Sequence, residues 1–453
     1  MSGEIVAADD RVRPVWFDAF LVGILAFLIF ALTAQYHDPV NNDTQATMLA
    51  AWQLAHHGNA TLTAFSGHYA WLFSSHGREV TNRLPGSIFW GTPFYTAFGR
   101  SDAPSIYPGA LAAATAAATA VAIAFTLACK LVRRRTAAIA ALLFGFGTGT
   151  WTVSSSQLWT HGPAEAAVLL TVLFCSQQRW LLAGIPAGFA VLVRPHLGIV
   201  ALILGVLGAV RGKSLRPLLI GVFSAVGGLI LLAYEHALWG RWMIFGGYDQ
   251  PVAASTHKAW ALFSGLIGDA VSPERGLLVM TPALLLLVPG LRRAWKVAPP
   301  WVQSAAFAGL GYLALQLWGI RFGGGDGFFS YRTTLEFLAL CVPLLTLCWR
   351  EWTSRTRLRR TSFAALAAVS VALHAFGALV HWLPPGLDQS PWRHYQPIAL
   401  ARHIGAIQTS LWVVGAVIAI GATAVIAWRR APAASDVTWT DRQTAAVTTD
   451  ALT

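Results

Sequence analysis

The chain has 453 residues, of which 55% are hydrophobic and only 11% are charged. Apolar runs of membrane length recur along it, which excludes an ordinary soluble globular protein and indicates a polytopic membrane protein. The formal net charge of +12 would suggest a nucleic-acid partner in a soluble protein. Here most basic residues follow the orientation rule for membrane loops, so no nucleic-acid partner is expected.

The opening segment, residues 1–15, carries acidic residues and precedes an apolar run without a small-residue cleavage site. We therefore predict a cytoplasmic N-terminal segment and a retained first span rather than a removed signal peptide. Residues 16–430 are predicted to form one all-α transmembrane bundle of about twelve spans, if each run crosses once. The runs lie near residues 16–34, 105–129, 136–150, 163–176, 181–193, 196–210, 217–235, 276–290, 301–320, 333–349, 361–382 and 406–428.

Positive charge gathers in alternate connections between these runs. Its main groups are Lys130 with Arg133, Arg134 and Arg135, Arg211 with Lys213 and Arg216, Arg292 with Arg293 and Lys296, and Arg350 with Arg355, Arg357, Arg359 and Arg360. Because cytoplasmic loops carry the excess of Lys and Arg, these connections and both termini are predicted to be cytoplasmic. Residues 431–453 are small, polar and unpatterned, which predicts a disordered cytoplasmic tail.

The opposite connections are longer and chemically richer, so the functional site is expected on the outer face of the membrane. The first of them, residues 35–104, contains two stretches apolar enough to lie along the interface as short helices, at 45–57 and 86–98. These helices would form a platform over the bundle. The Ala- and Arg-rich composition is typical of a bacterial chain and predicts a bacterial plasma membrane as the location.

The cysteines offer no sign of a disulfide framework or a metal site. All four lie in apolar runs without CxxC spacing or a neighbouring histidine cluster, namely Cys129, Cys175, Cys341 and Cys348. We therefore expect neither a zinc site nor a cofactor, and a divalent metal is not indicated.

Two carboxylates, Asp38 and Asp43, follow the first span on the outer side. A carboxylate near the outer leaflet can act as a general base towards a hydroxyl if it is within hydrogen-bond reach and partly screened from water. A structural interpretation is open for both residues. Asn42 or Asp43 before Gln45 resembles a helix N-cap, and Asp38-Pro39 resembles a turn.

Several arginines on the outer face break the orientation rule, and an anionic ligand is a good candidate for the cause. Arg83 precedes Leu-Pro-Gly at the start of an interfacial helix, where it could hold a phosphate; a solvated loop arginine is the alternative. Arg194 stands at the junction of two short runs and requires an acid or a ligand. Arg321 and Arg332 belong to a glycine-rich outer loop.

That loop, WGIRFGGGDGFFSYR at residues 318–332, also contains Asp326 and Tyr331. No strand precedes its glycines and no βαβ unit surrounds them, so a flexible loop over a lipid-linked substrate fits better than a nucleotide-binding loop. His161, at the start of a span, and Lys258, in another outer loop, are further candidates for substrate contacts. A structural histidine and a solvated lysine are the alternatives.

Taken in order, these segments resemble the GT-C superfamily of membrane glycosyltransferases. The resemblance rests on the acidic outer loop and helix from Asp43 to Leu62, Arg83-Leu84-Pro85-Gly86, the Gly-Thr-x-x-Trp…Trp-x-His segment from Gly147 to His161, Val193-Arg194-Pro195, SPERGLLVMTPALLLLVPGL at 272–291, and the loop at 319–332. The chain is most similar in kind to bacterial, actinobacterial-type polyprenyl-phosphate mannosyl- and arabinofuranosyltransferases and to the dolichyl-phosphate-mannose protein mannosyltransferases.

The resemblance implies an inverting transfer from a polyprenyl-phosphate sugar, which is a substrate and not a cofactor. By position, Asp43 matches the general base, and Asp38 a helper that orients the acceptor or the base. The candidates for the donor phosphate are Arg83, Arg194, Arg321 and Arg332. Mannose or arabinofuranose is the expected sugar, and a glycolipid, polysaccharide or protein the acceptor. Without a sizeable soluble domain at the C-terminus, a small glycolipid or lipid-anchored acceptor is favoured.

Two other functions are open at this point. A transporter or flippase of a lipid-linked sugar would place ionisable groups near the bilayer midplane and show two related halves. The unusual charges of this sequence instead cluster at the outer ends of spans. A non-catalytic membrane scaffold with the same fold predicts that changing Asp43 affects nothing beyond stability.

Overall fold

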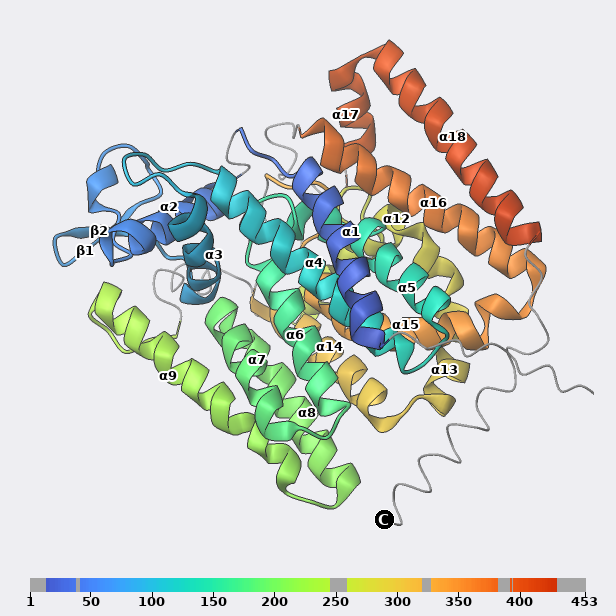
Figure 1. Cartoon of the computed structure of the whole chain (residues 1–453), viewed down its shortest axis with the longest axis horizontal. Helices are drawn as coiled ribbons and strands as arrows, with labels where there is room; N and C mark the ends of the chain where they lie inside the picture. Colours follow the sequence, from blue (N-terminus) through green and yellow to red (C-terminus); the bar gives the residue numbers. More distant parts are fainter. Residues whose placement is uncertain are drawn as a thin grey trace, which may run out of the picture.

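The computed structural model describes residues 14–37, 41–244, 259–319, 327–381, 392 and 394–429. Most of the predicted N-terminal segment and the whole predicted C-terminal tail lie outside them. The described part is a helical bundle (Figure 1). Its elements are α1 (Val15–Thr33), α2 (Asn42–His57), β1 (Phe73–Ser75), β2 (Arg78–Val80), α3 (Pro85–Phe98), α4 (Tyr107–Cys129), α5 (Arg134–Phe146), α6 (His161–Cys175), α7 (Trp180–Val193), α8 (Gly198–Gly212), α9 (Ile220–Trp239), α11 (Ala259–Val271), α12 (Leu277–Met280), α13 (Leu291–Val297), α14 (Pro300–Gly319), α15 (Leu335–Glu351), α16 (Arg357–Val380), α17 (Gln396–Ile404) and α18 (Ala406–Arg429).

The alanine-rich helix α4 is packed on several sides by other helices. It contacts α1, α5 and α6, and Figure 1 shows it between α1 and α6. Nearly all of its alanines are buried. Small side chains let helices approach closely, which matters in a bilayer because lipid tails are as apolar as the helix surfaces. The alanines of α4 therefore allow the first half of the bundle to pack around it.

Glycines permit two close contacts of the backbone. A Cβ atom at Gly227 of α9 would collide with the backbone of Gly188 in α7, so the two helices touch through their main chains. A Cβ atom at Gly86 would collide with the backbone of Val193. The start of α3 therefore lies directly on the end of α7, where Arg194 follows.

Six helices are long and apolar enough to cross a membrane by length and composition, namely α1, α4, Pro195–Gly212, Arg216–Trp239, α16 and α18. Further helices occupy the runs predicted at 136–150, 163–176, 181–193, 301–320 and 333–349. The run at 276–290 differs, because α12 is followed by two 3₁₀ turns that contain Pro282 and Pro289. Proline removes a backbone donor and clashes with the preceding turn, so one continuous helix does not form there. The total of about twelve spans stays a prediction.

Both predicted short helices are present as α2 and α3, within residues 35–104, and they gather with the hairpin β1–β2 at one end of the bundle (Figure 1). The strands pair antiparallel from Phe73↔Val80 to Ser75↔Arg78, and His76 and Gly77 turn between them with positive φ. Strands of three residues are too short to show an alternating pattern, so the all-α prediction missed this hairpin. The helices α11 and α17, within other outer connections, were not predicted either.

Helix ends that the charge pattern assigns to the cytoplasm contact one another. Arg134 at the start of α5 pairs with Asp18 near the start of α1, with 2.7 Å between Nη1 and Oδ2. Arg350 near the end of α15 donates to the carbonyl oxygen of Leu131 at 2.8 Å. The bundle thus joins ends that the orientation rule places on one face. Which face of the membrane this is stays a prediction.

Candidate functional site

Asp43 stands in the first turn of α2. The N-cap of this helix is Asn41, whose side chain accepts a hydrogen bond from the backbone N–H of Asp43 at 2.7 Å. The predicted cap at Asn42 or Asp43 is therefore wrong by one or two residues. Because Asn41 already satisfies this backbone donor, the Asp43 carboxylate makes other contacts. The partial positive charge of the helix N-terminus also favours an anion at this position.

Two arginines from distant parts of the chain hold the Asp43 carboxylate. Arg83 Nη1 lies 2.8 Å from Asp43 Oδ1, and Arg332 Nη1 lies 3.3 Å from Asp43 Oδ2. Arg83 precedes α3, and its Nε and Nη2 atoms donate to Asn82 Oδ1 at 2.8 and 2.6 Å. The fold thus brings three predicted site residues together, and we call Asp43, Arg83 and Arg332 the charged triad.

Aromatic rings fix the guanidinium of Arg332. Its Cζ atom lies 5.1 Å from the ring centre of Trp159 and 4.9 Å from that of Phe328. Phe328 is itself held, because Arg275 Nη1 donates to its carbonyl oxygen at 2.9 Å. A guanidinium packed on aromatic faces keeps a defined plane, and its N–H groups project from the edge of that plane. Arg332 is thereby directed at Asp43.

The two guanidinium groups set the charge of Asp43. Burial alone raises the pKa of its carboxyl, but the positive charges of Arg83 and Arg332 and the hydrogen bond from Arg332 lower it more. The resulting pKa is below the ordinary aspartate value, so Asp43 is ionised at neutral pH. Its side chain is 31% exposed, against 12% for Arg83 and 18% for Arg332, and a substrate can therefore reach the carboxylate.

A second cluster is buried close by. Arg194 Nη1 lies 3.1 Å and His161 Nδ1 lies 2.9 Å from Glu336 Oε1. Tyr312 donates to Glu336 Oε2, and Arg194 Nη2 donates to Gln316 Oε1, each at 2.8 Å. The acid that Arg194 requires is thus Glu336, whose side chain is completely buried. Buried charges are tolerated when they are paired and hydrogen-bonded in this way.

Trp159 connects the two groups. Its ring packs against Arg332 and lies 6.5 Å from the ring of His161. Sequence reasoning missed Glu336, although a lone acid inside the run at 333–349 was a signal that a cation must lie nearby. It could not show that this cation is Arg194, which is 142 residues away. The substrate role of His161 and the phosphate role of Arg194 stay predictions.

Tyr331 is held inside the bundle. Its hydroxyl lies 2.8 Å from Thr281 Oγ1, and Thr281 also donates to the carbonyl oxygen of Gly147 at 3.0 Å. The Tyr331 side chain is fully buried, and its ring packs edge-on against His374. The predicted substrate contact of Tyr331 stays a prediction. Four other predicted site residues lie outside the described part of the chain, namely Asp38, Lys258, Arg321 and Asp326.

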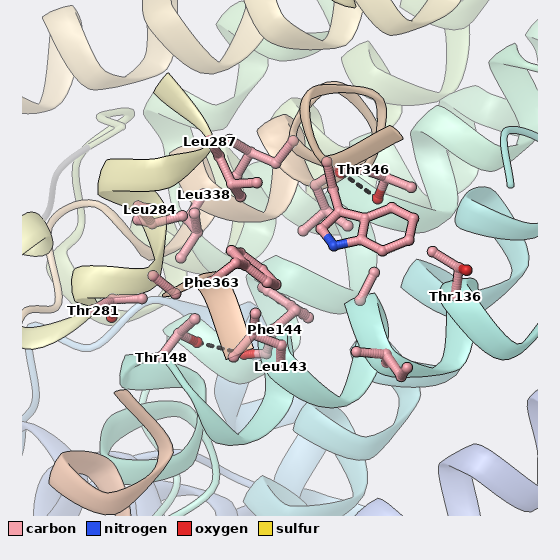
Figure 2. A pocket seen from close by; sticks show the side chains of 16 residues that line it. Thr136, Leu143, Phe144, Thr148, Thr281, Leu284, Leu287, Leu338, Thr346 and Phe363 are labelled. Carbon is pink, nitrogen blue, oxygen red and sulfur yellow. Dashed lines mark hydrogen bonds between the residues drawn. The ribbon is translucent and has the colours of Figure 1, made fainter. Parts of the chain in front are cut away.

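Two cavities in the described part of the chain lie away from the charged triad. One of about 80 Å³ lies between α5, α15 and α16, and Figure 2 shows apolar side chains such as Leu143, Phe144 and Leu338 around it. A wider apolar groove of about 900 Å³ runs between α1, α5, α16 and α18. The charged triad lines neither of them. Among the described residues, no group of three or more His, Cys, Asp or Glu side chains could hold a metal ion.

Comparison with known proteins finds similarity to a solved structure. No protein-family model matches the chain, and no curated protein matches it. Among solved structures, the crystal structure of ArnT from Cupriavidus metallidurans in the apo state is similar, with a TM-score of 0.54 over 91% of this chain and 75% of that chain. At 12% identity the similarity shows the fold alone. The chain therefore shares its helical fold with that structure.

Proposed function

We propose that the protein is a GT-C-type glycosyltransferase that moves a sugar from a polyprenyl-phosphate donor to an acceptor hydroxyl on the outer face of the membrane. The observation that carries the proposal is the charged triad, in which two guanidinium groups hold one ionised, partly exposed carboxylate at Asp43. A base for a hydroxyl and cations for a phosphate are the two requirements of this reaction. The shared fold with ArnT agrees with it.

In the proposed reaction, the acceptor oxygen attacks C1 of the sugar while the bond between C1 and the phosphate oxygen breaks. The electron pair of that bond leaves with the phosphate, and the acceptor proton passes to the Asp43 carboxylate. A single displacement from the face opposite the phosphate inverts the configuration at C1. Asp38 is the proposed helper that orients the acceptor or the base.

The two arginines of the triad are suited to different tasks. Arg83 is tied to Asn82 and to Asp43 by short contacts, so it keeps the base in place. Arg332 has the longer contact with Asp43, at 3.3 Å, and is the better candidate for the donor phosphate. Charge grows on that phosphate in the transition state, where a fixed cation stabilises it most. A phosphate bound to Arg332 also weakens the contact between Arg332 and Asp43. The pKa of the Asp43 carboxyl then rises, which makes the carboxylate a stronger base.

The finer assignments follow the sequence resemblance. Mannose and arabinofuranose are the proposed sugars, and a glycolipid, polysaccharide or protein of the bacterial envelope is the proposed acceptor. Candidates for binding the donor phosphate also include Arg194 and Arg321. Candidates for other contacts with the substrate are His161, Tyr331, Asp326 and Lys258. No cofactor is needed, because the lipid phosphate is the leaving group.

The positions of the buried charges favour transfer over transport. His161 begins α6, Arg194 directly follows α7, and Glu336 stands in the first turn of α15. All three therefore occupy helix ends. A carrier that moves a lipid-linked sugar across the bilayer requires ionisable groups near the midplane instead.

The proposal is tested with purified protein in proteoliposomes that contain radiolabelled polyprenyl-phosphate mannose or arabinofuranose. A membrane lipid extract of the producing organism supplies the acceptor. We expect the label to move from one of the donors to an extracted acceptor, with an equal amount of free polyprenyl phosphate. Label that stays on the donor lipid in every reaction would contradict the proposal.

Arg83→Gln is expected to move the acidic limb of the pH profile of kcat/KM to higher pH. The cation at Arg83 lowers the pKa of Asp43, so its removal raises that pKa, and the base is then lost to protonation at a higher pH. Arg100→Gln is the matched control, because Arg100 lies exposed in the same outer loop and pairs with Asp102 instead. An acidic limb that stays in place, or moves to lower pH, in Arg83→Gln would contradict the assigned base.

A further inference from the structure

The backbone at residues 328–330 belongs to no helix or strand and ends two residues before Arg332. We call these three residues the clamped segment, and all of them are buried. Buried backbone carbonyls need hydrogen-bond partners, and side chains supply them here. Arg275 Nη1 donates to the carbonyl oxygens of Phe328 and Ser330, at 2.9 and 3.1 Å. One guanidinium nitrogen thus bridges the two ends of the segment.

Two further side chains hold the clamped segment. Thr152 Oγ1 donates to the carbonyl oxygen of Phe329 at 3.1 Å. Gln396, the first residue of α17, donates from Nε2 to the carbonyl oxygen of Phe328 at 3.1 Å. Its Oε1 atom accepts a hydrogen bond from the backbone N–H of Ser330 at 2.5 Å. Every carbonyl of the segment is therefore tied to a side chain from a distant part of the chain.

The shape that these contacts impose is strained at Ser330. Its φ is +74°, in the left-handed region that residues other than glycine rarely adopt. Such a conformation persists only where the surrounding structure imposes it, and it is common at functional sites. The Ser330 hydroxyl has no hydrogen-bond partner in the described part of the chain, so it does not fix the backbone itself. The contacts of Arg275 and Gln396 do so instead.

The ring of Phe328 connects this clamp to the charged triad. Its centre lies 3.9 Å from Arg275 Cζ and 4.9 Å from Arg332 Cζ, so one ring packs against both guanidinium groups. Neutral donors would satisfy the carbonyls of the segment, and burying the Arg275 cation is costly. Its charge is explained by the contact with the face of Phe328, which is attractive to cations.

We propose that Arg275 and Gln396 are positioning residues, whose hold on the clamped segment presents Arg332 to the donor phosphate. This inference rests on the proposed function. Arg332 also contacts Asp43 at 3.3 Å, so the clamp sets the distance between the phosphate ligand and the base. A misplacement of about 1 Å in a reacting site can lower the rate about 100-fold. Loss of the clamp should therefore affect both functions of Arg332 together.

The test measures kcat/KM for the polyprenyl-phosphate donor as a function of pH in proteoliposomes, for wild type and Arg275→Gln. We expect the variant to lose about 10- to 100-fold in kcat/KM. Its acidic limb should also move to higher pH. Burial raises the pKa of the Asp43 carboxyl, and the charge and hydrogen bond of Arg332 are among the causes that lower it, so a displaced Arg332 lets that pKa rise. A merely structural role would reduce the amount of active enzyme equally at every pH and leave the limb in place.

Two further variants make the test specific. Arg350→Gln is the matched control, because Arg350 also donates to a backbone carbonyl, that of Leu131, and should keep both the rate and the limb. Arg275→Gln combined with Arg332→Gln should lose little more than Arg332→Gln alone, because both changes act through one guanidinium. Losses that simply add would overturn the positioning role.

The outcomes also separate this inference from the proposed function. If wild type transfers sugar and folded Arg275→Gln keeps its kcat/KM and its acidic limb, the positioning role is overturned while the proposed function stands. If wild type transfers no sugar, both fail. Arg275→Gln removes an ion pair with Glu274, so thermal unfolding in detergent checks its folding. If it does not fold, Gln396→Leu, which removes no charge, decides by the same two measurements.

Discussion

Replacing Asp43 by asparagine is expected to lower kcat for sugar transfer by about 100- to 10,000-fold, which is the range that a positioned general base contributes. Asparagine has nearly the same shape, and its one carbonyl oxygen can still accept a hydrogen bond from Arg83 or Arg332, but it cannot take the acceptor proton. Asn41 still caps the helix, so α2 should fold as before. The measurement is the initial rate in proteoliposomes, with thermal unfolding in detergent as a check of folding.

Asp102→Asn is the matched control for this prediction. Asp102 belongs to the same outer loop and is likewise paired with an arginine, at 2.6 Å from Arg100, but its side chain is 63% exposed. Its replacement should leave kcat unchanged. An equal loss in both variants would attribute the effect to the charge of the loop, and wild-type turnover by Asp43→Asn would remove Asp43 from the catalytic role.

Glu336→Gln is expected to lower the free energy of unfolding by about 3–5 kcal/mol, because it removes the carboxylate from a buried ion pair and leaves the guanidinium of Arg194 in place. Glu336 is completely buried and also accepts hydrogen bonds from Tyr312 and contacts His161. The three helix ends that meet there, of α6, α7 and α15, should loosen together. Unfolding in a denaturing detergent measures the loss.

The loss of stability in Glu336→Gln is compared with that in two other variants. Asp18→Asn breaks the ion pair between Asp18 and Arg134, whose side chains are 25% and 35% exposed. The free energy of unfolding should fall by only about 0–1 kcal/mol. The double variant Arg194→Met with Glu336→Leu should recover part of the stability lost in Glu336→Gln, because it removes both buried charges, although Tyr312 and Gln316 lose their hydrogen-bond partners. A loss in Glu336→Gln no larger than that in Asp18→Asn would show that the cluster does not stabilise the fold.

Hydropathy and charge predicted much of the bundle, because a bilayer imposes strong rules on both. The runs at 16–34 and 361–382 appear as α1 and α16, and the interfacial stretches appear as α2 and α3. The run at 276–290 was hydrophobic enough to suggest a span, yet Pro282 and Pro289 break its helix. Hydropathy measures solvent preference and not backbone continuity. It was therefore insensitive to these prolines and to the short hairpin at Phe73–Val80.

The candidate site was predictable residue by residue but not as an arrangement. Outer arginines that break the orientation rule pointed to Arg83 and Arg332, and the resemblance pointed to Asp43. Arg332 and Asp43 are 289 residues apart in the chain, so only the three-dimensional fold shows that they meet.

The central claim is that Asp43 takes the acceptor proton while the donor phosphate is held nearby. A single-turnover experiment tests it most directly, with enzyme in excess over radiolabelled polyprenyl-phosphate sugar, saturating acceptor and chemical quenching at successive times. We expect Asp43→Asn to bind the donor about as well as wild type in a filter-binding assay but to leave its C1–phosphate bond intact. Cleavage and transfer at the wild-type rate by that variant would contradict the account.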